Sequence, residues 1–293
     1  MNETPSQYSE ALVTCDWLET HLNDPDLVIF DCTTYLVPHE GPNRPYDIQS
    51  GKADYDEGHI PGAGYFDLQK DFSVADSPYR FTLPSAQETA ATFARHGVSD
   101  GKRVVLYSRK NLQWATRFWW MLRWLGFNNV SILDGGYDKW VADGRMTSTN
   151  QCKYQAGQLS INLRPELFVG KEAVKSAIGA PETCTINALA ADLHRGENPR
   201  YGRPGRVPGS VNVPATTLFN SKTMEMLPKD TVAQTFIAIG ADPTKRIIVY
   251  CGGGIAATLD AFLLHELGYR DIAVYDNSLS EWATDVSLPV ETD

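Results

Sequence analysis

The sequence lacks any apolar run close to the ~20 residues that a membrane-spanning helix needs. Its start, MNETPSQYSE, contains neither the basic nor the apolar region of a signal peptide. Positive charge is also in deficit, because 26 Lys and Arg face 36 Asp and Glu and the formal net charge is -10. That sign is wrong for a phosphate-binding surface. We therefore expect a cytoplasmic protein with neither a membrane nor a nucleic acid as partner.

Cysteine is scarce and scattered. The chain has five cysteines, an odd number, and no two of them form a C-x-x-C pair. They are Cys15, Cys32, Cys152, Cys184 and Cys251. This pattern favours neither a disulfide framework nor a zinc site, so no metal is expected. At most one or two of these thiols should take part in chemistry.

The length of the sequence and a repeat within it indicate two similar domains. Its 293 residues suit two domains of about 100 to 150 residues, and a hydrophobic fraction of 42% is enough to close two cores without disulfides. Residues 26–32 and 183–189 each predict a short buried strand, and a long polar segment follows each strand. Those segments end in 58–68 and 205–215, which share the turn pattern G-x-[IV]-P-G. The shared turn indicates that the second half repeats the plan of the first.

Each half continues with a β-branched strand, a helix closed by glycine, and a further strand. In order these elements are 102–108, 114–127 and 129–140 in the first half and 245–251, 256–269 and 271–282 in the second. Such alternation with short loops is typical of βαβ units that build a parallel sheet. Residues 142–160 have few large apolar side chains, so we place a linker there and predict α/β domains at 8–145 and 160–293.

Cys251 is the candidate nucleophile, because it ends a predicted buried strand. Gly252, Gly253 and Gly254 follow it before Ile255 opens a helix. Three glycines allow a tight turn with inward N–H groups, and the helix start adds partial positive charge. That field attracts anions and favours a nucleophilic thiolate. The alternative is a small hydrophobic residue that closes the strand beside a simple turn; the combination of loop, helix start and repeat favours the reactive thiol.

The far end of this loop excludes one kind of chemistry. A phosphatase loop of similar shape needs an arginine there to hold the phosphoryl group. Here the sequence has Ala256, Ala257 and Thr258 instead. Phosphate-ester chemistry is therefore disfavoured.

Five motifs, spread over nearly the whole chain, carry a family resemblance. They are GHIPGA (58–63), FWWMLRWLGF (118–127), LDGGYDKW (133–140), GRVPGSVNVP (205–214) and CGGGIA (251–256). With these motifs the chain resembles a tandem-domain sulfurtransferase of the rhodanese superfamily. The resemblance implies two tandem rhodanese-like domains, each with a mainly parallel central sheet flanked by helices.

The resemblance also implies a mechanism. Cys251 would accept a sulfane sulfur from a small anionic donor and carry it as a persulfide cradled by the loop amides. The acceptor would be cyanide, a thiol or a thioredoxin-like protein, and no metal or organic cofactor would be needed. Family members usually lack the cysteine in the first domain, and here Ser108 occupies the matching place. We therefore expect the first domain to be catalytically silent and to form a wall of the interdomain cleft.

The loop composition bears on the donor. Relatives that use thiosulfate resemble one another in basic residues at the second and third loop positions, whereas mercaptopyruvate users have small neutral ones. Gly252 and Gly253 are neutral, which favours 3-mercaptopyruvate and leaves thiosulfate second. Mercaptopyruvate users often carry a serine at the third position, where this chain has Gly253, so a serine-based proton relay cannot operate.

A carboxylate donor also calls for guanidinium groups, which residues 194–206 supply. Arginines in this segment resemble the carboxylate clamp of mercaptopyruvate users, and Arg195 and Arg200 are the candidates. The alternative is a solvated loop that balances an acidic protein. The sequence leaves open whether His59, Arg203 or Arg206 enters the cleft, and a turn residue is the favoured role of His59.

Two other functions compete with this enzyme hypothesis. In one, the protein is a sulfur carrier or regulatory binding module that hands persulfide sulfur only to a protein partner. The neutral loop makes that function compatible with the sequence. In the other, Cys251 is a redox sensor, which is disfavoured because no resolving cysteine is evident nearby in the sequence.

Overall fold

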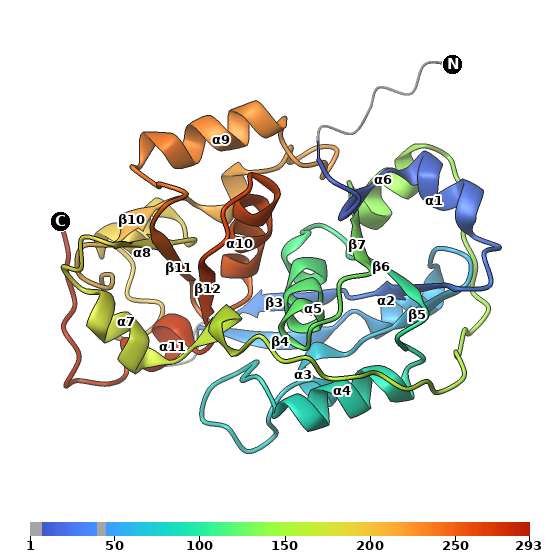
Figure 1. The fold of residues 1–293 in the computed structure, drawn as a ribbon, viewed down its shortest axis with the longest axis horizontal. Coiled ribbons are helices and arrows are strands. Elements are labelled where there is room, and N and C mark those ends of the chain that lie inside the picture. Colours follow the sequence, from blue (N-terminus) through green and yellow to red (C-terminus); the bar gives the residue numbers. More distant parts are fainter. Residues whose placement is uncertain (1–7, 40–44) are drawn as a thin grey trace.

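A computed structural model describes residues 8–39 and 45–293. Within these residues the chain forms two five-stranded sheets and one two-stranded hairpin. The sheet of the first half lies on the right of Figure 1 and that of the second half on the left, each with helices packed around it. None of the helices in this part of the chain has the length and apolar character of a membrane span.

The first sheet has the strand order β1-β7-β6-β2-β5, and all of its pairings are parallel. Its strands are β1 (Leu12–Val13), β2 (Leu27–Asp31), β5 (Ala63–Tyr65), β6 (Arg103–Tyr107) and β7 (Val130–Leu133). The antiparallel hairpin consists of β3 (Thr34–Pro38) and β4 (Tyr46–Ser50). The helices are α1 (Cys15–His21), α2 (Lys52–Glu57), α3 (Leu68–Asp71), α4 (Ala86–Arg95), α5 (Gln113–Trp124) and α6 (Gly136–Ala142).

The second sheet has the order β10-β9-β11-β12-β8 and is also parallel throughout. Its strands are β8 (Phe168–Val169), β9 (Thr183–Asn187), β10 (Val211–Asn212), β11 (Arg246–Tyr250) and β12 (Ile272–Tyr275). The α-helices are α7 (Lys171–Ala177), α8 (Ala191–Arg195), α9 (Lys229–Ala238), α10 (Ala256–Glu266) and α11 (Ser278–Trp282), with short 3-10 turns at Pro165–Leu167 and Ala215–Thr217. Strand for strand this is the order of the first sheet, so the predicted repeat and the α/β fold are confirmed.

The burial of the central strands β6 and β11 explains why the sequence predicted both of them. The last four residues of each strand are buried, because helices cover both faces of the sheet. A strand buried on both sides is a continuous apolar run, as parallel sheets require. Both strands therefore deliver the residue that follows them, Ser108 or Cys251, to the carboxyl edge of a rigid sheet.

Helices α5 and α10 join the two halves, and they lie side by side at the centre of Figure 1. The hydroxyl oxygens of Thr116 and Thr258, which occupy matching positions of the repeat, are 2.9 Å apart. Trp119 of α5 packs edge-on against Phe262 of α10, with ring centroids 5.0 Å apart. The tryptophan-rich helix is thus core, since Trp119 and Trp120 are both buried.

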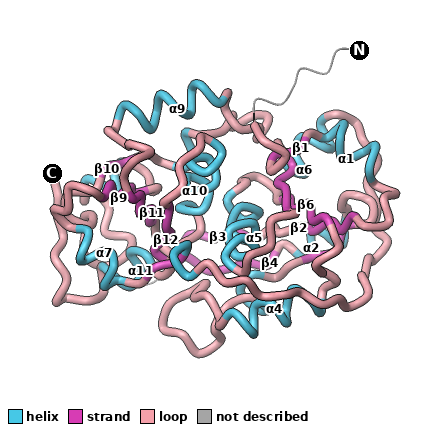
Figure 2. Tube along the Cα trace, viewed as in Figure 1, coloured by secondary structure: helices cyan, strands magenta, loops and turns pink. Residues whose placement is uncertain are grey.

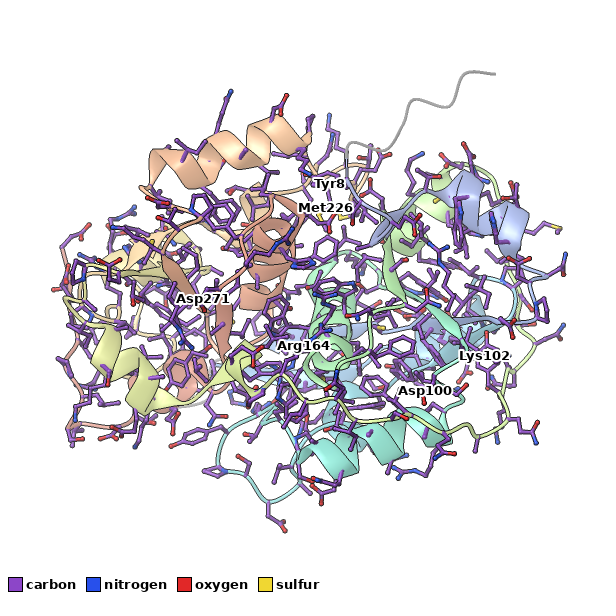
Figure 3. All side chains as sticks on the ribbon, in the orientation of Figure 1. Tyr8, Asp100, Lys102, Arg164, Met226 and Asp271 are labelled. Atoms are coloured by element: carbon purple, nitrogen blue, oxygen red, sulfur yellow. The ribbon has the colours of Figure 1, made fainter. Side chains whose placement is uncertain are left out.

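Two matching aspartates extend this contact across the domains. Asp276 accepts hydrogen bonds from the Arg117 guanidinium (2.6 Å) and from the backbone N–H of Leu83 (2.8 Å). Asp134 accepts a hydrogen bond from the backbone N–H of Met226 (2.8 Å). Met226 is labelled in Figure 3, next to Tyr8. Each domain therefore sends one carboxylate into the other, and the two sheets are held in a fixed relation.

The expected linker is hydrogen-bonded along the first domain. Gly157 N–H donates to the carbonyl of Ala94 (2.8 Å), and the carboxylate of Asp100, labelled in Figure 3, accepts from Ser160 N–H (2.9 Å). The Tyr154 hydroxyl accepts from Ile29 N–H (2.9 Å) at the sheet. Figure 2 shows the segment as loop passing α4 and α5. Because these contacts are scattered hydrogen bonds with few apolar side chains, composition did not reveal them.

One buried carboxyl group, that of Asp260, has no counterpart in the first half of the repeat. Asp260 on α10 is fully buried, and neither carboxylate oxygen has a hydrogen-bond partner among the described residues. The matching residue in α5 is Phe118, which packs against Phe66 and Phe72. Burial therefore raises the pKa of Asp260 well above its usual value, and the folded protein holds this carboxyl group in its neutral form.

Replacing Asp260 with Asn should stabilise the protein increasingly as pH rises. Below about pH 4 the carboxyl group is neutral in both states, whereas at higher pH the unfolded chain ionises and the folded one does not. The stability gain should grow by at most about 1.4 kcal/mol per pH unit above that point. Denaturant unfolding of wild type, Asp260→Asn and the exposed control Asp230→Asn measures it. A gain that is equal at pH 5 and pH 8 would contradict this account.

Candidate functional site

Cys251 is the first residue after β11, and its side chain is 2% exposed. The loop that follows turns at Gly254, whose φ is +72°, and α10 begins at Ala256. A methyl group at Gly254 would overlap the carbonyl oxygen of Asp276. The structure thus contains the predicted strand, glycine loop and helix start, and glycine is required at the turn.

The hydroxyl group of Ser278 organises this loop. It accepts hydrogen bonds from the N–H groups of Cys251 (3.0 Å) and Gly254 (3.2 Å), and it donates to the carbonyl of Tyr275 (2.7 Å). Ser278 has a φ of +51°, a left-handed conformation that a serine rarely adopts. The matching residue of the first domain is Gly136, with a φ of +55°. The second domain keeps the same backbone and adds a hydroxyl that tethers the loop.

The neighbouring residues of α11 hold the loop carbonyls. Leu279 N–H donates to the carbonyl of Cys251 (3.1 Å), while the N–H and hydroxyl of Ser280 both donate to that of Gly252 (2.9 and 2.6 Å). Within the described residues, the N–H groups of Gly252, Gly253 and Ile255 donate to no protein group. With the carbonyls tethered on one side, these amides are available to an anionic group on the other.

A cavity of about 680 Å³ opens beside the loop, between the two domains. The first domain contributes Tyr46 and Arg80 to its wall, and the second contributes Arg200, Tyr201 and Ser280. Ser280 connects the cavity to the loop because its hydroxyl is bonded to the Gly252 carbonyl. The volume lies within the roughly 300 to 1,000 Å³ of small-molecule sites.

The cavity is positively charged. Arg80 and Arg200 line it, and the described lining residues include no carboxylate. The Arg80 guanidinium lies 5.5 Å from the ring centroid of Tyr46. Burial, followed by the proximity of Cys251, raises the pKa of Tyr46, and burial raises that of Tyr201. Both phenols therefore stay protonated and can donate hydrogen bonds to an anionic ligand.

Tyr201 explains the first glycine of the loop. Its ring packs so closely on Gly252 that a Cβ atom there would overlap the phenol. At Gly253 the nearest side-chain atoms to such a Cβ are the Tyr46 hydroxyl (3.5 Å) and Phe81 Cδ2 (3.7 Å), which is ordinary contact distance. The second loop position is thus closed to any side chain, and the third has room for a small one.

Of the two candidate arginines, the structure brings only Arg200 to the cavity. Arg195 ends α8 and forms an ion pair with Glu197, with Nε and Oε1 2.7 Å apart and a guanidinium side chain that is 42% exposed. It is not among the residues that line the cavity.

Three further candidates have structural contacts. Arg203 donates to four backbone carbonyls of the segment 282–288. Arg206 pairs with Glu291 and Asp293. His59 is buried and stacks on Tyr55, and its ring nitrogens contact two backbone carbonyls. None of these three lines the cavity, and the favoured role of His59 as a turn residue agrees with these contacts.

The matching loop of the first domain has a different arrangement. Ser108 is buried, and its hydroxyl donates to the carbonyl of Asn111 (2.6 Å). The N–H of Lys110 donates to the carboxylate of Asp138 (2.7 Å), the residue that matches Ser280. A carboxylate of the protein itself therefore takes up one of the loop amides that the matching loop of the second domain leaves unbonded.

Sequence reasoning did not find Tyr46, Arg80, Tyr201 or Ser278. The signal for Ser278 was present, since the repeat aligns it with Gly136 between an aspartate and a tryptophan that both halves share. Tyr201 is the neighbour of Arg200 in an irregular segment. Tyr46 and Arg80 belong to first-domain segments with no counterpart in the quoted repeat, so no internal comparison pointed to them.

Comparison with known proteins identifies the class. The family model for the rhodanese-like domain matches residues 14–143 and 189–285. The chain therefore belongs to the rhodanese-like family, as a tandem-domain member, and it is an enzyme of the sulfurtransferase type.

Individual relatives are similar to this protein over most of the chain. The 3-mercaptopyruvate sulfurtransferase of Escherichia coli K12 is 33% identical over 282 residues, covering 95% of this chain and 97% of that protein. The rat 3-mercaptopyruvate sulfurtransferase is 33% identical over 288 residues, covering 94% of this chain and 93% of that protein. The crystal structure of SseA from Escherichia coli superposes with a TM-score of 0.78 at 31% identity, covering 92% of this chain and 99% of that one.

The two glycines should respond differently to the same substitution. Gly252→Ala forces the Tyr201 ring aside, at about 1–3 kcal/mol for overpacking, and should lower kcat/KM of sulfur transfer about tenfold or more. Gly253→Ala meets only ordinary contacts and should stay within about threefold of wild type. Steady-state kinetics on the matched pair decides, and equal losses in both variants would contradict the role assigned to Tyr201.

Proposed function

We propose that this sulfurtransferase takes its sulfur from 3-mercaptopyruvate, with thiosulfate as the second donor, and carries it as a persulfide on Cys251. Acceptors are a thiol, cyanide or a thioredoxin-like protein. The observation that carries the proposal is one arrangement: Tyr46 and Tyr201 lie against the loop that begins at Cys251, and both line a cavity with two guanidinium groups and no carboxylate among its described lining residues. The names of the Escherichia coli and rat relatives support the choice of donor.

In the first step the Cys251 thiolate attacks the sulfur of the donor. The new S–S bond forms as the carbon–sulfur bond of mercaptopyruvate breaks, and the electron pair leaves with the carbon as an enolate. The enolate takes one proton and departs as pyruvate. The amides of Gly252, Gly253 and Ile255 are placed to stabilise the negative outer sulfur of the persulfide.

The residues that line the cavity support the remaining roles that we propose. Arg200 would bind the donor carboxylate, with Arg80 adding positive charge from the first domain. Tyr46 stays protonated and its hydroxyl lies 3.5 Å from the position of a Cβ at Gly253, and in our proposal this phenol supplies the proton that no serine can. In the second step a nucleophilic acceptor attacks the outer sulfur, and the Cys251 thiolate leaves.

The two candidate arginines offer a matched test. Arg200→Gln should raise KM for 3-mercaptopyruvate about 10- to 100-fold, because it removes a charged hydrogen bond worth about 1.5–3 kcal/mol. Arg195→Gln makes the same chemical change at an exposed ion pair and should leave KM within about twofold. Pyruvate release with a thiol acceptor is the assay, run beside thiosulfate on each protein.

Two results would overturn parts of the proposal. Faster turnover with thiosulfate than with mercaptopyruvate would reverse the order of donors. No turnover of the wild type with either small donor would favour the alternative, a carrier that hands sulfur only to a protein partner.

A further inference from the structure

A second positively charged cavity lies on the seam between the domains. It has a volume of about 140 Å³ and is lined by Arg123 of α5, Arg164 of the connecting segment, His265 of α10 and Arg270 just before β12. Figure 3 places Arg164 between the two halves of the molecule. This cavity shares no lining residue with the one beside Cys251.

None of the three arginines forms an ion pair within the described residues, although the carboxylate of Glu266 acts on Arg123. The Nη1 atom of Arg164 is buried without a hydrogen-bond partner within residues 8–39 and 45–293. The Arg123 guanidinium donates to the Asn128 side-chain oxygen (2.9 Å) and lies over the Trp119 ring. One carboxylate, on the exposed Glu166, lines the cavity. A buried guanidinium N–H group without a hydrogen-bond partner is costly unless a ligand completes it.

Like charges from different parts of the fold face one another here. Burial, then Arg164 and Arg270, lowers the pKa of Arg123 to about 10. Burial, then the three arginines, lowers the pKa of His265 to about 4, so this imidazole is neutral near pH 7. Elsewhere on the same seam, Asp276 and Arg117 attract across the domains. The arrangement around Arg164 instead repels, although the protein as a whole carries a net charge of -10.

We propose that this seam cavity binds one small oxyanion with two negative charges, of the phosphate and sulfate class. Guanidinium groups match the oxygen geometry of such ions, and three of them converge from α5, the connecting segment and the second domain. The volume is below the roughly 300 Å³ of pockets for larger organic ligands, which excludes a nucleotide. A bound dianion replaces the repulsion between the domains with a shared partner.

The proposal predicts how substitutions at this cavity change the Tm with and without phosphate. Without the anion, Arg164→Gln and Arg270→Gln each remove a repelling charge, so each variant should melt at or above the wild-type Tm. With phosphate at about ten times its Kd, the wild-type Tm should rise by about 3 °C, and the two variants should lose most of that rise. Arg195→Gln, whose side chain lies in a surface ion pair, should show the full wild-type response.

The experiment is thermal unfolding of the full chain with phosphate or sulfate titrated against chloride at equal ionic strength. Isothermal titration of phosphate should show one binding site fewer in either variant than in the wild type, because binding at the loop beside Cys251 is common to all three proteins. Equal shifts in phosphate and chloride, or a full phosphate response in both variants, would overturn the proposal. Because the readout is unfolding and binding rather than turnover, failure of the proposed donor chemistry leaves this test unaffected.

Discussion

The tether between Ser278 and the loop that begins at Cys251 is the contact on which the site depends. One hydroxyl accepts from two loop amides, and the adjacent residues of α11 bind two loop carbonyls, so the loop is held from beneath along its length. The remaining amides are thereby fixed in one orientation before any ligand arrives, which is what electrostatic preorganisation requires. The left-handed backbone of Ser278 is the local strain that accompanies this placement.

The first domain acts on this site through its position. Reciprocal aspartates and the contact of α5 with α10 fix the two sheets together, and this brings Tyr46 and Arg80 against the loop of the second domain. The glycines of the loop carry no charge, so the charge that binds an anionic donor comes from the cavity walls. The closed space at Gly252, filled by Tyr201, is the structural reason why a basic side chain cannot stand there.

Much of the fold could be predicted from the sequence because buried parallel strands and glycine-closed helices repeat in both halves. The position of Cys251 followed from the same periodicity. The sequence could not decide between Arg195 and Arg200. Residues 196–206 form no helix or strand, so the side-chain directions depend on contacts such as the ion pair of Arg195 with Glu197. Tyr46 and Arg80 could not be predicted because they reach the site only when the domains pack. The linker contacts could not be predicted because they are scattered hydrogen bonds rather than a periodic apolar pattern.

The central claim is that Cys251 carries the transferred sulfur, and intact mass of the reduced protein after brief exposure to 3-mercaptopyruvate tests it most directly. The account predicts a gain of one sulfur atom in the wild type and in Ser108→Ala, and no gain in Cys251→Ser. A sulfur atom that persists in Cys251→Ser, or a wild type that gains none from either mercaptopyruvate or thiosulfate, would contradict it.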